Sequence, residues 1–454
     1  MKRFLTCLAA VLALSAALCV GAAASDFDAV AEDLSAIGMF RGTSDGFELD
    51  RAPTRSEAAI MLVRLYGAEE TAKEAYDADT LRCPFTDVST FSAPYVAWLY
   101  ENGIANGTSA TTFGSSQPCS AKMYCAFLLR ALGYEDGTDF AYADTLTFAQ
   151  SKGIYDSLLF SGDFLRDDLA ALTYQALAAD TKDGSTYLLA SLIADGAVDA
   201  EAARPMTEQI EAYRTLASAQ LENRSMDVDV SMDMDMTMDM DGQAISLPTV
   251  SEGRVQVILG EESVEMASTV ETTAQGQTTS TGTWMKDGWV YVSASGGGET
   301  MRYKYQMDQQ MQDLMAMSGV DMEALNVSGL AMIDSIQAEK SGSDTVYTVK
   351  MSKGLGSAMD AVSALAGQDL GSMDIGEITA VYTMDANGEM KAVSMTFSVS
   401  MELDVPLDDG TVSTVSAKMA YDADMTIRAT GDDVKITFPD FSDFQEMDLS
   451  ELNP

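Results

Sequence analysis

The chain has 454 residues, 47% of them hydrophobic, which is enough for about two to four domains with packed cores. Its formal net charge of -43 repels phosphate backbones and anionic lipid head groups, so nucleic acid and membrane surfaces are excluded as favoured partners. Histidine is absent, which removes Ser-His-Asp and Cys-His nucleophile pairs and every imidazole-built metal site. We therefore expect no catalytic residue, no metal site and no cofactor.

Residues 1–24 have the pattern of a signal peptide. Lys2 and Arg3 are basic, an apolar run covers 4–20, and small residues at 22–24 suit signal peptidase. We expect cleavage before Ser25 and no lipid anchor. No later apolar run is long enough to cross a bilayer, so the sequence predicts an exported chain with no transmembrane segment.

The first of three related helical units covers about residues 26–67. An apolar stripe at helical spacing ends at Gly38, where a glycine stops the helix. Thr54 then precedes Glu57 by three residues, which is the pattern of a capping box. The pattern predicts a new helix that presents Arg55 in its first turn.

The second unit covers about residues 83–134. It has an aromatic helix ending at Gly103, a Thr-Phe turn, and a second amphipathic helix. Ser120 follows Gly103 at the same distance as Arg55 follows Gly38, which aligns the two units. Asp87 is expected to cap the aromatic helix.

The third unit covers about residues 138–195 and has a shorter loop. The sequence predicts a helix over 140–149 that ends before Gly153, and a second helix that Leu165-Arg166-Asp167-Asp168 begins. Arg166 thereby takes the place that Arg55 has in the first unit. A helix over 187–193 completes the unit.

These features together resemble the S-layer homology domain family over about residues 26–204. The family pattern is Phe-x-Asp-Val, an aromatic helix, Gly-Ile-x-x-Gly, a Thr-Phe turn and a Thr-Arg-Ala-Glu helix start. The second unit matches most of it, from Phe85-Thr-Asp87-Val88 through Gly103-Ile104-Ala-Asn-Gly107 to Thr112-Phe113. In place of Thr-Arg-Ala-Glu it has Cys119-Ser120-Ala121-Lys122.

The resemblance implies an all-α bundle of three repeats with pseudo-threefold symmetry, in domain 25–204, that binds a secondary cell-wall polymer, often pyruvylated. It implies Thr54, Arg55, Glu57 and Arg166 as the polymer-binding residues, since a guanidinium at a helix start pairs well with a carboxylate. The alternative for Arg55 is a solvated side chain beside Glu57. Lys122 stands two positions from the arginine's place and is expected to have no such role.

Three cysteines remain after the signal peptide, Cys83, Cys119 and Cys125, all in or beside the second unit. A bridge from Cys83 to one of the others and three buried thiols are both open from the sequence.

Residues 205–454 are predicted to form an α+β domain with a curved antiparallel sheet and an acidic C-terminal tail. A helix over 206–224 leads into residues 226–241, where methionine or valine alternates with mostly aspartate. This period of two predicts a long strand whose methionines pack in a core and do not bind copper. Further strands with Asp-Gly and Asn-Gly turns follow, with helices at 307–317 and 355–366 and a closing strand at 434–438.

The order of elements over 206–438 also resembles LolA-like or LppX-like surface lipoproteins of Gram-positive bacteria. That resemblance implies a half-barrel whose apolar face holds a lipid or amphipathic ligand. The sequence thus predicts a wall-anchored cell-surface protein that is not an enzyme and whose sheet domain binds an apolar or amphipathic ligand or another surface component. The alternatives are a structural surface-layer component without a small ligand, and a wall glycan hydrolase that uses two carboxylates.

Overall fold

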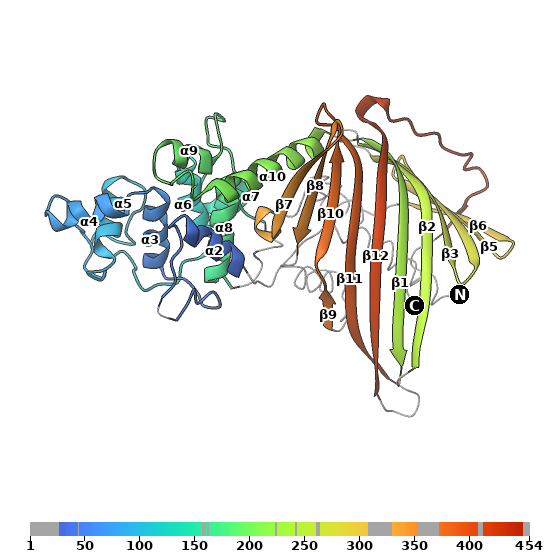
Figure 1. The fold of residues 1–454 in the computed structure, drawn as a ribbon, viewed down its shortest axis with the longest axis horizontal. Coiled ribbons are helices and arrows are strands. Elements are labelled where there is room, and N and C mark those ends of the chain that lie inside the picture. The colour runs from blue at the N-terminus through green and yellow to red at the C-terminus, as the bar shows by residue number, and fades with distance from the viewer. Residues whose placement is uncertain are drawn as a thin grey trace. The chain divides into compact units, whose positions relative to one another are not determined.

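The computed structural model describes residues 27–43, 45–156, 160, 163–222, 225–240, 243–259, 264–306, 329–351, 372–406 and 412–447 (Figure 1). Within these, 27–214 with 329–334 form one compact unit, the helical unit, and the rest form a second, the sheet unit. The expected signal peptide, the helices at 307–317 and 355–366, and the acidic tail after 447 lie outside the described residues.

Helices make up the N-terminal part of the chain, as predicted. They are α2 (Asp28–Ala36), α3 (Arg55–Leu65), α4 (Glu69–Asp77), α5 (Ala93–Glu101), α6 (Ala121–Ala131), α7 (Thr145–Gln150), α8 (Arg166–Ala178), α9 (Leu188–Ala194) and α10 (Arg204–Glu222), with short 3-10 turns at Tyr142–Asp144 and Leu330–Met332. None of the helices in the described part of the chain is both long and apolar enough to cross a membrane.

Two helix boundaries differ from the sequence predictions, and one helix was missed. The helix expected over 140–149 begins only at Thr145, because the amide of Gly137 donates to the Phe140 carbonyl in a turn. Helix α10 begins at Arg204, and Pro205 occupies its first turn, where the missing amide costs no hydrogen bond. Helix α4 was not predicted, since its strongly polar sequence has only two buried residues.

Six helices in the described residues end on a glycine with positive φ. The sequence predicted three of these glycines, Gly38, Gly103 and Gly153, with φ of 78°, 71° and 70°. In each case the amide after the glycine donates to the carbonyl five residues back, at 2.9, 2.9 and 3.0 Å. This is the hydrogen bond of a Schellman motif, so α2, α5 and α7 end in the same way.

Helix α8 lies in the centre of the helical unit. All of its residues except Asp168 are buried, and it packs against α2, α6 and α9. The hydroxyls of Tyr124 in α6 and Thr173 in α8 are 2.7 Å apart, which satisfies both in the core. Cys119 and Cys125 are buried free thiols and Cys83 is a partly buried one, so the structure has the thiol alternative.

The sheet unit contains one open sheet of 13 strands in the described residues (Figure 1). The strands β1 to β12 pair antiparallel, as predicted, while the two-residue β13 pairs parallel to β6. Their order is β13-β6-β5-β4-β3-β2-β1-β12-β11-β10-β8-β7, with β9 beside β11. The bounds are β1 (Met226–Met240), β2 (Gln243–Leu259), β3 (Val264–Ala274), β4 (Gln277–Lys286), β5 (Trp289–Gly296), β6 (Glu299–Gln306), β7 (Ser335–Ser341), β8 (Asp344–Met351), β9 (Ser372–Ile375), β10 (Ile378–Met384), β11 (Met390–Pro406), β12 (Val412–Thr430) and β13 (Gln445–Glu446).

The methionine and aspartate alternation of β1 is confirmed as a strand. Met232 and Met234 are partly buried, whereas Asp233 and Asp235 are exposed on the opposite face. Met234 pairs with Tyr421 of β12, so aromatic and methionine side chains share the apolar face. The methionines therefore form part of an apolar sheet face, as the period of two predicted.

Strand β2 starts eleven residues earlier than the predicted strand at Arg254. Pro248 lies inside this extension and pairs with Asp235 of β1. Strand β3 joins β2 only from Thr249 onward, so among the described strands β2 has a single neighbour at Pro248. Proline is tolerated there because its missing amide removes no ladder hydrogen bond.

The closing strand predicted at 434–438 is wrong. The segment from Val434 to Phe444 forms no backbone ladder. The Lys435 carbonyl accepts a hydrogen bond from the Gln256 side chain at 2.9 Å, and aromatic side chains make further contacts. The ring of Phe441 stacks on that of Tyr291 in β5, with the ring centres 3.7 Å apart. The ring of Phe444 lies edge-on to that of Trp284 in β4. The apolar residues of this segment pack their rings on the sheet, and their spacing resembles the alternation of a strand.

Candidate functional site

Helix α3 begins with the capping box that the sequence predicted. The hydroxyl of Thr54 accepts a hydrogen bond from the Glu57 amide at 3.2 Å, and the Thr54 amide donates to the Glu57 carboxylate at 2.8 Å. Two amides that have no partner within the helix are thereby satisfied. Arg55 is the first helical residue, directly after the cap.

The Arg55 guanidinium is partly buried and has only neutral partners in the described part of the chain. Its Nη2 donates to the Asn106 carbonyl at 2.7 Å, and its Nη1 lies 3.2 Å from Sδ of Met123. The group lies 4.7 Å from the ring centre of Phe113 and 5.8 Å from that of Phe127. Its Nε is buried without a hydrogen-bond partner. Burial lowers the pKa of Arg55.

Arg55 lines a pocket of about 240 Å³ in the helical unit. A second guanidinium, that of Arg130, lines it too; it donates to the Ile104 carbonyl at 2.9 Å and lies 3.4 Å from the Asp136 carboxylate. Two arginines and one aspartate leave the pocket with one excess positive charge, in a chain whose net charge is -43. The full lining is Arg55, Asn106, Gly107, Met123, Ala126, Phe127, Arg130, Asp136 and Tyr142.

Tyr142 gives the pocket an exposed aromatic ring. Its side chain is 44% exposed. Lys122 lies 5.6 Å from the centre of that ring and donates to the Ala143 carbonyl at 2.8 Å. Lys122 therefore contacts a residue of the pocket wall, a contact that the sequence did not predict.

Arg166, the first residue of α8, has a different environment. Its side chain is only 6% exposed, and its Nη1 lies 3.1 Å from the carboxylate of Glu57. Its Nε donates to the Phe47 carbonyl at 2.9 Å. Glu57 also accepts from Arg51 at 2.6 Å. Burial opposes ionisation of Glu57, but the hydrogen bonds from Arg51 and Thr54 outweigh it and lower the pKa to about 2.

Helix α6 begins one residue later than the sequence alignment predicted. Ser120 is the cap, since its hydroxyl accepts from the Met123 amide at 3.3 Å, and Ala121 is the first helical residue. Ala121 and not Ser120 therefore corresponds to Arg55, because the preceding loop of this unit is one residue longer. Met123 corresponds to Glu57, a match that the sequence alignment missed.

The starts of these helices are joined by a repeated backbone pattern. The amide of Arg55 donates to the Gln117 carbonyl and that of Arg166 to the Arg51 carbonyl, both at 2.9 Å. Each acceptor lies three residues before the cap of the next helix. The amide of the second residue in each helix donates to the carbonyl two positions before that acceptor, at 3.2 Å in both cases. The start of α8 thus lies against the segment before α3, and the start of α3 against the segment before α6.

Asp87 binds the backbone of the Thr-Phe turn. It does not cap the aromatic helix, which the sequence had led us to expect. Its carboxylate accepts from the amides of Phe113 and Gly114 at 2.7 Å each and from that of Ser115 at 3.1 Å. The carbonyl of Ser115 in turn accepts from the Ser56 amide of α3. Asp87 therefore supports the loop that carries the ring beneath Arg55.

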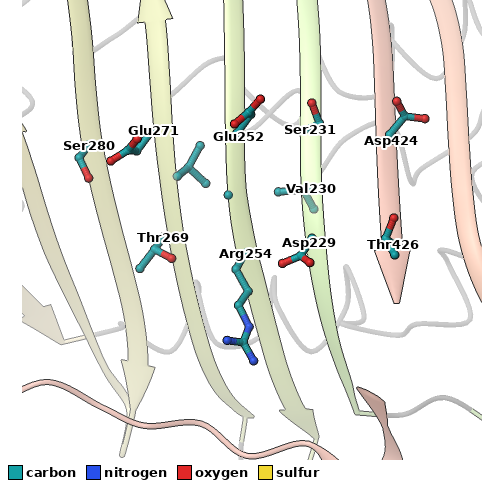
Figure 2. Close-up of a pocket in the computed structure, with 12 residues that line it drawn as sticks. Asp229, Val230, Ser231, Glu252, Arg254, Thr269, Glu271, Ser280, Asp424 and Thr426 are labelled. Carbon is teal, nitrogen blue, oxygen red and sulfur yellow. The ribbon is translucent and has the colours of Figure 1, made fainter. Parts of the chain in front are cut away.

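A larger hollow of about 600 Å³ lies on the polar face of the sheet unit (Figure 2). Asp424, Ser231, Glu252, Glu271 and Ser280 form one row across β12, β1, β2, β3 and β4. The hollow is lined by Asp229, Val230, Ser231, Glu252, Gly253, Arg254, Thr269, Val270, Glu271, Ser280, Asp424 and Thr426.

The cations near this hollow are already paired. Nε of Arg254 lies 2.7 Å from Asp227, and Arg428 lies 2.7 Å from Asp229. Within the described ranges no three His, Cys, Asp or Glu side chains are placed to hold a metal ion. The pocket at Arg55 is smaller, but it brings together two cations and aromatic rings, so we consider it the better candidate site.

A family model supplies an independent observation. Residues 84–120 match the S-layer homology domain. This match covers the Asp87 turn and ends at Ser120, directly before α6. It bears out the resemblance for the second unit.

Two curated relatives match parts of the chain. A "Cell surface protein" of Thermoanaerobacter kivui is 27% identical over 219 residues, which are 44% of this chain and 28% of that protein. An "Endoglucanase" of Bacillus sp. (strain KSM-635) is 29% identical over 108 residues, which are 20% of this chain and 12% of that enzyme. The chain thus spans less than a third of either relative.

Similar solved structures include a DUF1329 family protein from Desulfovibrio piger and a LolA superfamily protein from Nitrosomonas europaea. They are 10% and 9% identical, cover 50% and 49% of this chain and 95% of their own, and have TM-scores of 0.18 and 0.13. TM-scores this low do not support an inference about the fold or the ligand of this chain.

Proposed function

We propose that this chain is a cell-surface protein whose helical unit binds an anionic secondary cell-wall polymer without a covalent bond. The match of residues 84–120 to the S-layer homology domain and the likeness to a cell surface protein support the location. The observation that carries the binding proposal is Arg55, a partly buried guanidinium with no carboxylate partner among the described residues.

The pocket at Arg55 suits a monoanionic sugar substituent such as a pyruvate ketal. Its excess charge is one, and two guanidinium groups can donate to a carboxylate. Phe127 and Tyr142 give apolar surface for the face of a sugar ring. We assign direct contact to Arg55, while Thr54 and Glu57 fix its direction and Arg166 holds Glu57 in place.

The helical unit is proposed to consist of three related repeats. The shared glycine ends of α2, α5 and α7 and the two equivalent backbone contacts at the starts of α3 and α8 support this arrangement. The corresponding contact at the start of α6 would involve residue 162, which lies outside the described residues.

Cosedimentation with isolated Gram-positive cell wall tests the binding proposal. The full chain should sediment with wall that carries its secondary polymer and not with wall stripped of it by hydrofluoric acid. Arg55→Gln should weaken binding by about tenfold or more, since it removes a charge-assisted contact. Arg82→Gln is the matched control, because Arg82 is 76% exposed and pairs only with Asp79 in the described residues. Failure of the wild-type chain to sediment would remove the proposal.

For the sheet unit we propose binding of a lipid or amphipathic ligand, without enzymatic activity. The partly buried methionines of β1 on an apolar sheet face support this. Native mass spectrometry after incubation with a fatty acid tests it. Bare protein at every lipid concentration would favour a structural surface-layer component, and release of reducing sugar from wall would favour a hydrolase.

A further inference from the structure

The helix starts contact one another through their side chains in a fixed order. The first residue of α8, Arg166, reaches the third residue of α3, Glu57, at 3.1 Å. The first residue of α3, Arg55, reaches the third residue of α6, Met123, at 3.2 Å. The backbone contacts between the same pairs of helix starts are equivalent as well. Both junctions therefore place a guanidinium on the same position of the next helix.

The two junctions differ in the residue that receives the guanidinium. They also differ three residues before the cap, where Arg51 pairs with Glu57 at one junction and the neutral Gln117 stands at the other. At the α8–α3 junction a carboxylate receives it, and the pair is neutral. At the α3–α6 junction a thioether receives it, which is a weak acceptor without charge. At the start of α6 the first residue is Ala121, so a third junction of this kind would have no guanidinium to offer.

We propose that Met123 is the residue that makes the helical unit an anion binder at one junction only. This rests on the proposed function, because it names what leaves Arg55 available to the polymer. A carboxylate in place of Met123 would occupy the Arg55 guanidinium as Glu57 occupies Arg166. The chain then offers one anionic subsite, at the α3–α6 junction, and the α8–α3 junction serves as an internal ion pair.

The local sequence favours folding of the decisive variant. Met123→Glu completes a Ser-x-x-Glu capping box with Ser120, the arrangement that Thr54 and Glu57 already form at α3. The new carboxylate would stand three residues after the cap, where Glu57 stands in α3. The variant is therefore expected to be at least as stable as the wild-type chain, so a loss of binding cannot be assigned to unfolding.

Cosedimentation of the full chain with polymer-bearing wall tests the proposal. Met123→Glu should bind about tenfold or more weakly than Met123→Gln, which has the same length and no charge. Ala121→Arg, outside the pocket, should bind as the wild type does. Thermal unfolding of each variant measures its stability alongside.

The outcomes separate this inference from the proposed function. If wild-type protein binds wall, Arg55→Gln does not, and Met123→Glu binds as well as Met123→Gln, the role of Met123 is overturned while Arg55 keeps its own. If the wild-type protein binds more than one polymer chain per molecule, the limit to one subsite is overturned. If the wild type does not bind, the proposed function itself fails.

Discussion

The starts of helices α3 and α8 share a first residue and its backbone contacts, but they differ in exposure and in the side chain that receives the guanidinium. Arg166 is 6% exposed and paired with Glu57, whereas Arg55 is partly buried and meets a carbonyl, a thioether and two rings. The same residue type at the same helical position thus serves as an internal ion pair in one place and lines an open pocket in the other. The partner on the neighbouring helix decides between them.

Four predictions test this comparison. The largest effect is expected for Glu57→Ala, which leaves the buried Arg166 without its counter-charge and removes the capping box. The free energy of unfolding of the helical unit should fall by about 3 kcal/mol or more. Hydrogen exchange of the α8 amides in the full chain measures it. An effect below about 1 kcal/mol would mean that Arg166 finds another partner and that the two arginines are alike.

The next effect concerns Asp168, the third residue of α8. Asp168 is half-buried, and the partial loss of solvation raises its pKa from the ordinary 3.8 to about 7; Asp167 adds to the rise, and the Leu165 amide opposes it. The folded state therefore holds this proton more tightly than the unfolded state, and stability is lost as pH rises from about 4 to about 7. Tyr155 is the other titratable group facing it.

Asp168→Asn should accordingly remove this pH dependence. At pH 8 the variant should be more stable than the wild type by about 2 kcal/mol, and at pH 4 the two should be equal. Thermal unfolding across this range measures the difference. Parallel curves for the two proteins would show that Asp168 ionises normally in the folded state.

The third effect concerns the stability that the N-cap residues Thr54 and Ser120 contribute. Thr54→Ala should destabilise the helical unit by about 1 kcal/mol, as loss of a helix cap usually does. Ser120→Ala should cost less, because Met123 cannot return the hydrogen bond that Glu57 returns to Thr54. Equal costs, measured by hydrogen exchange of α3 and α6, would contradict the distinction between the two starts.

The smallest effect is expected at Arg55 itself. Arg55→Met keeps packing against Phe113 and removes a charge without a carboxylate partner and one hydrogen bond to the exposed Asn106 carbonyl, so stability should change by less than about 0.5 kcal/mol. Arg166→Met should cost several times more, because it leaves Glu57 with Arg51 alone. Similar losses for the two variants would break the comparison.

Local signals in the sequence predicted much of this arrangement. The Thr54–Glu57 capping box and the positive-φ glycines act within a few residues, and the period of two in β1 is a property of one strand. The caps and glycine ends are readable because their hydrogen bonds close within the segment itself, and the strand is readable because its side chains alternate between two faces. For the same reason the helix starts of α3 and α8 were placed correctly.

Long-range contacts were beyond the sequence. Arg166 meets Glu57 across 109 positions and Arg55 meets Met123 across 68, so no local pattern encodes either pair. Counting from Gly103 misaligned α6 by one residue, because loops accept an insertion without changing the helices they join. The segment at 434–438 was mistaken for a strand since aromatic side chains, and not a backbone ladder, hold it.

Asp87 accepts hydrogen bonds from three amides and thereby influences the Arg55 pocket, although it does not line that pocket. It fixes the turn at 113–115, which supplies both the ring beneath Arg55 and an acceptor for the start of α3. Releasing the turn would remove the ring beneath the Arg55 guanidinium without changing any residue that lines the pocket. A substitution of Asp87 could therefore abolish binding in a chain whose pocket residues are all unchanged.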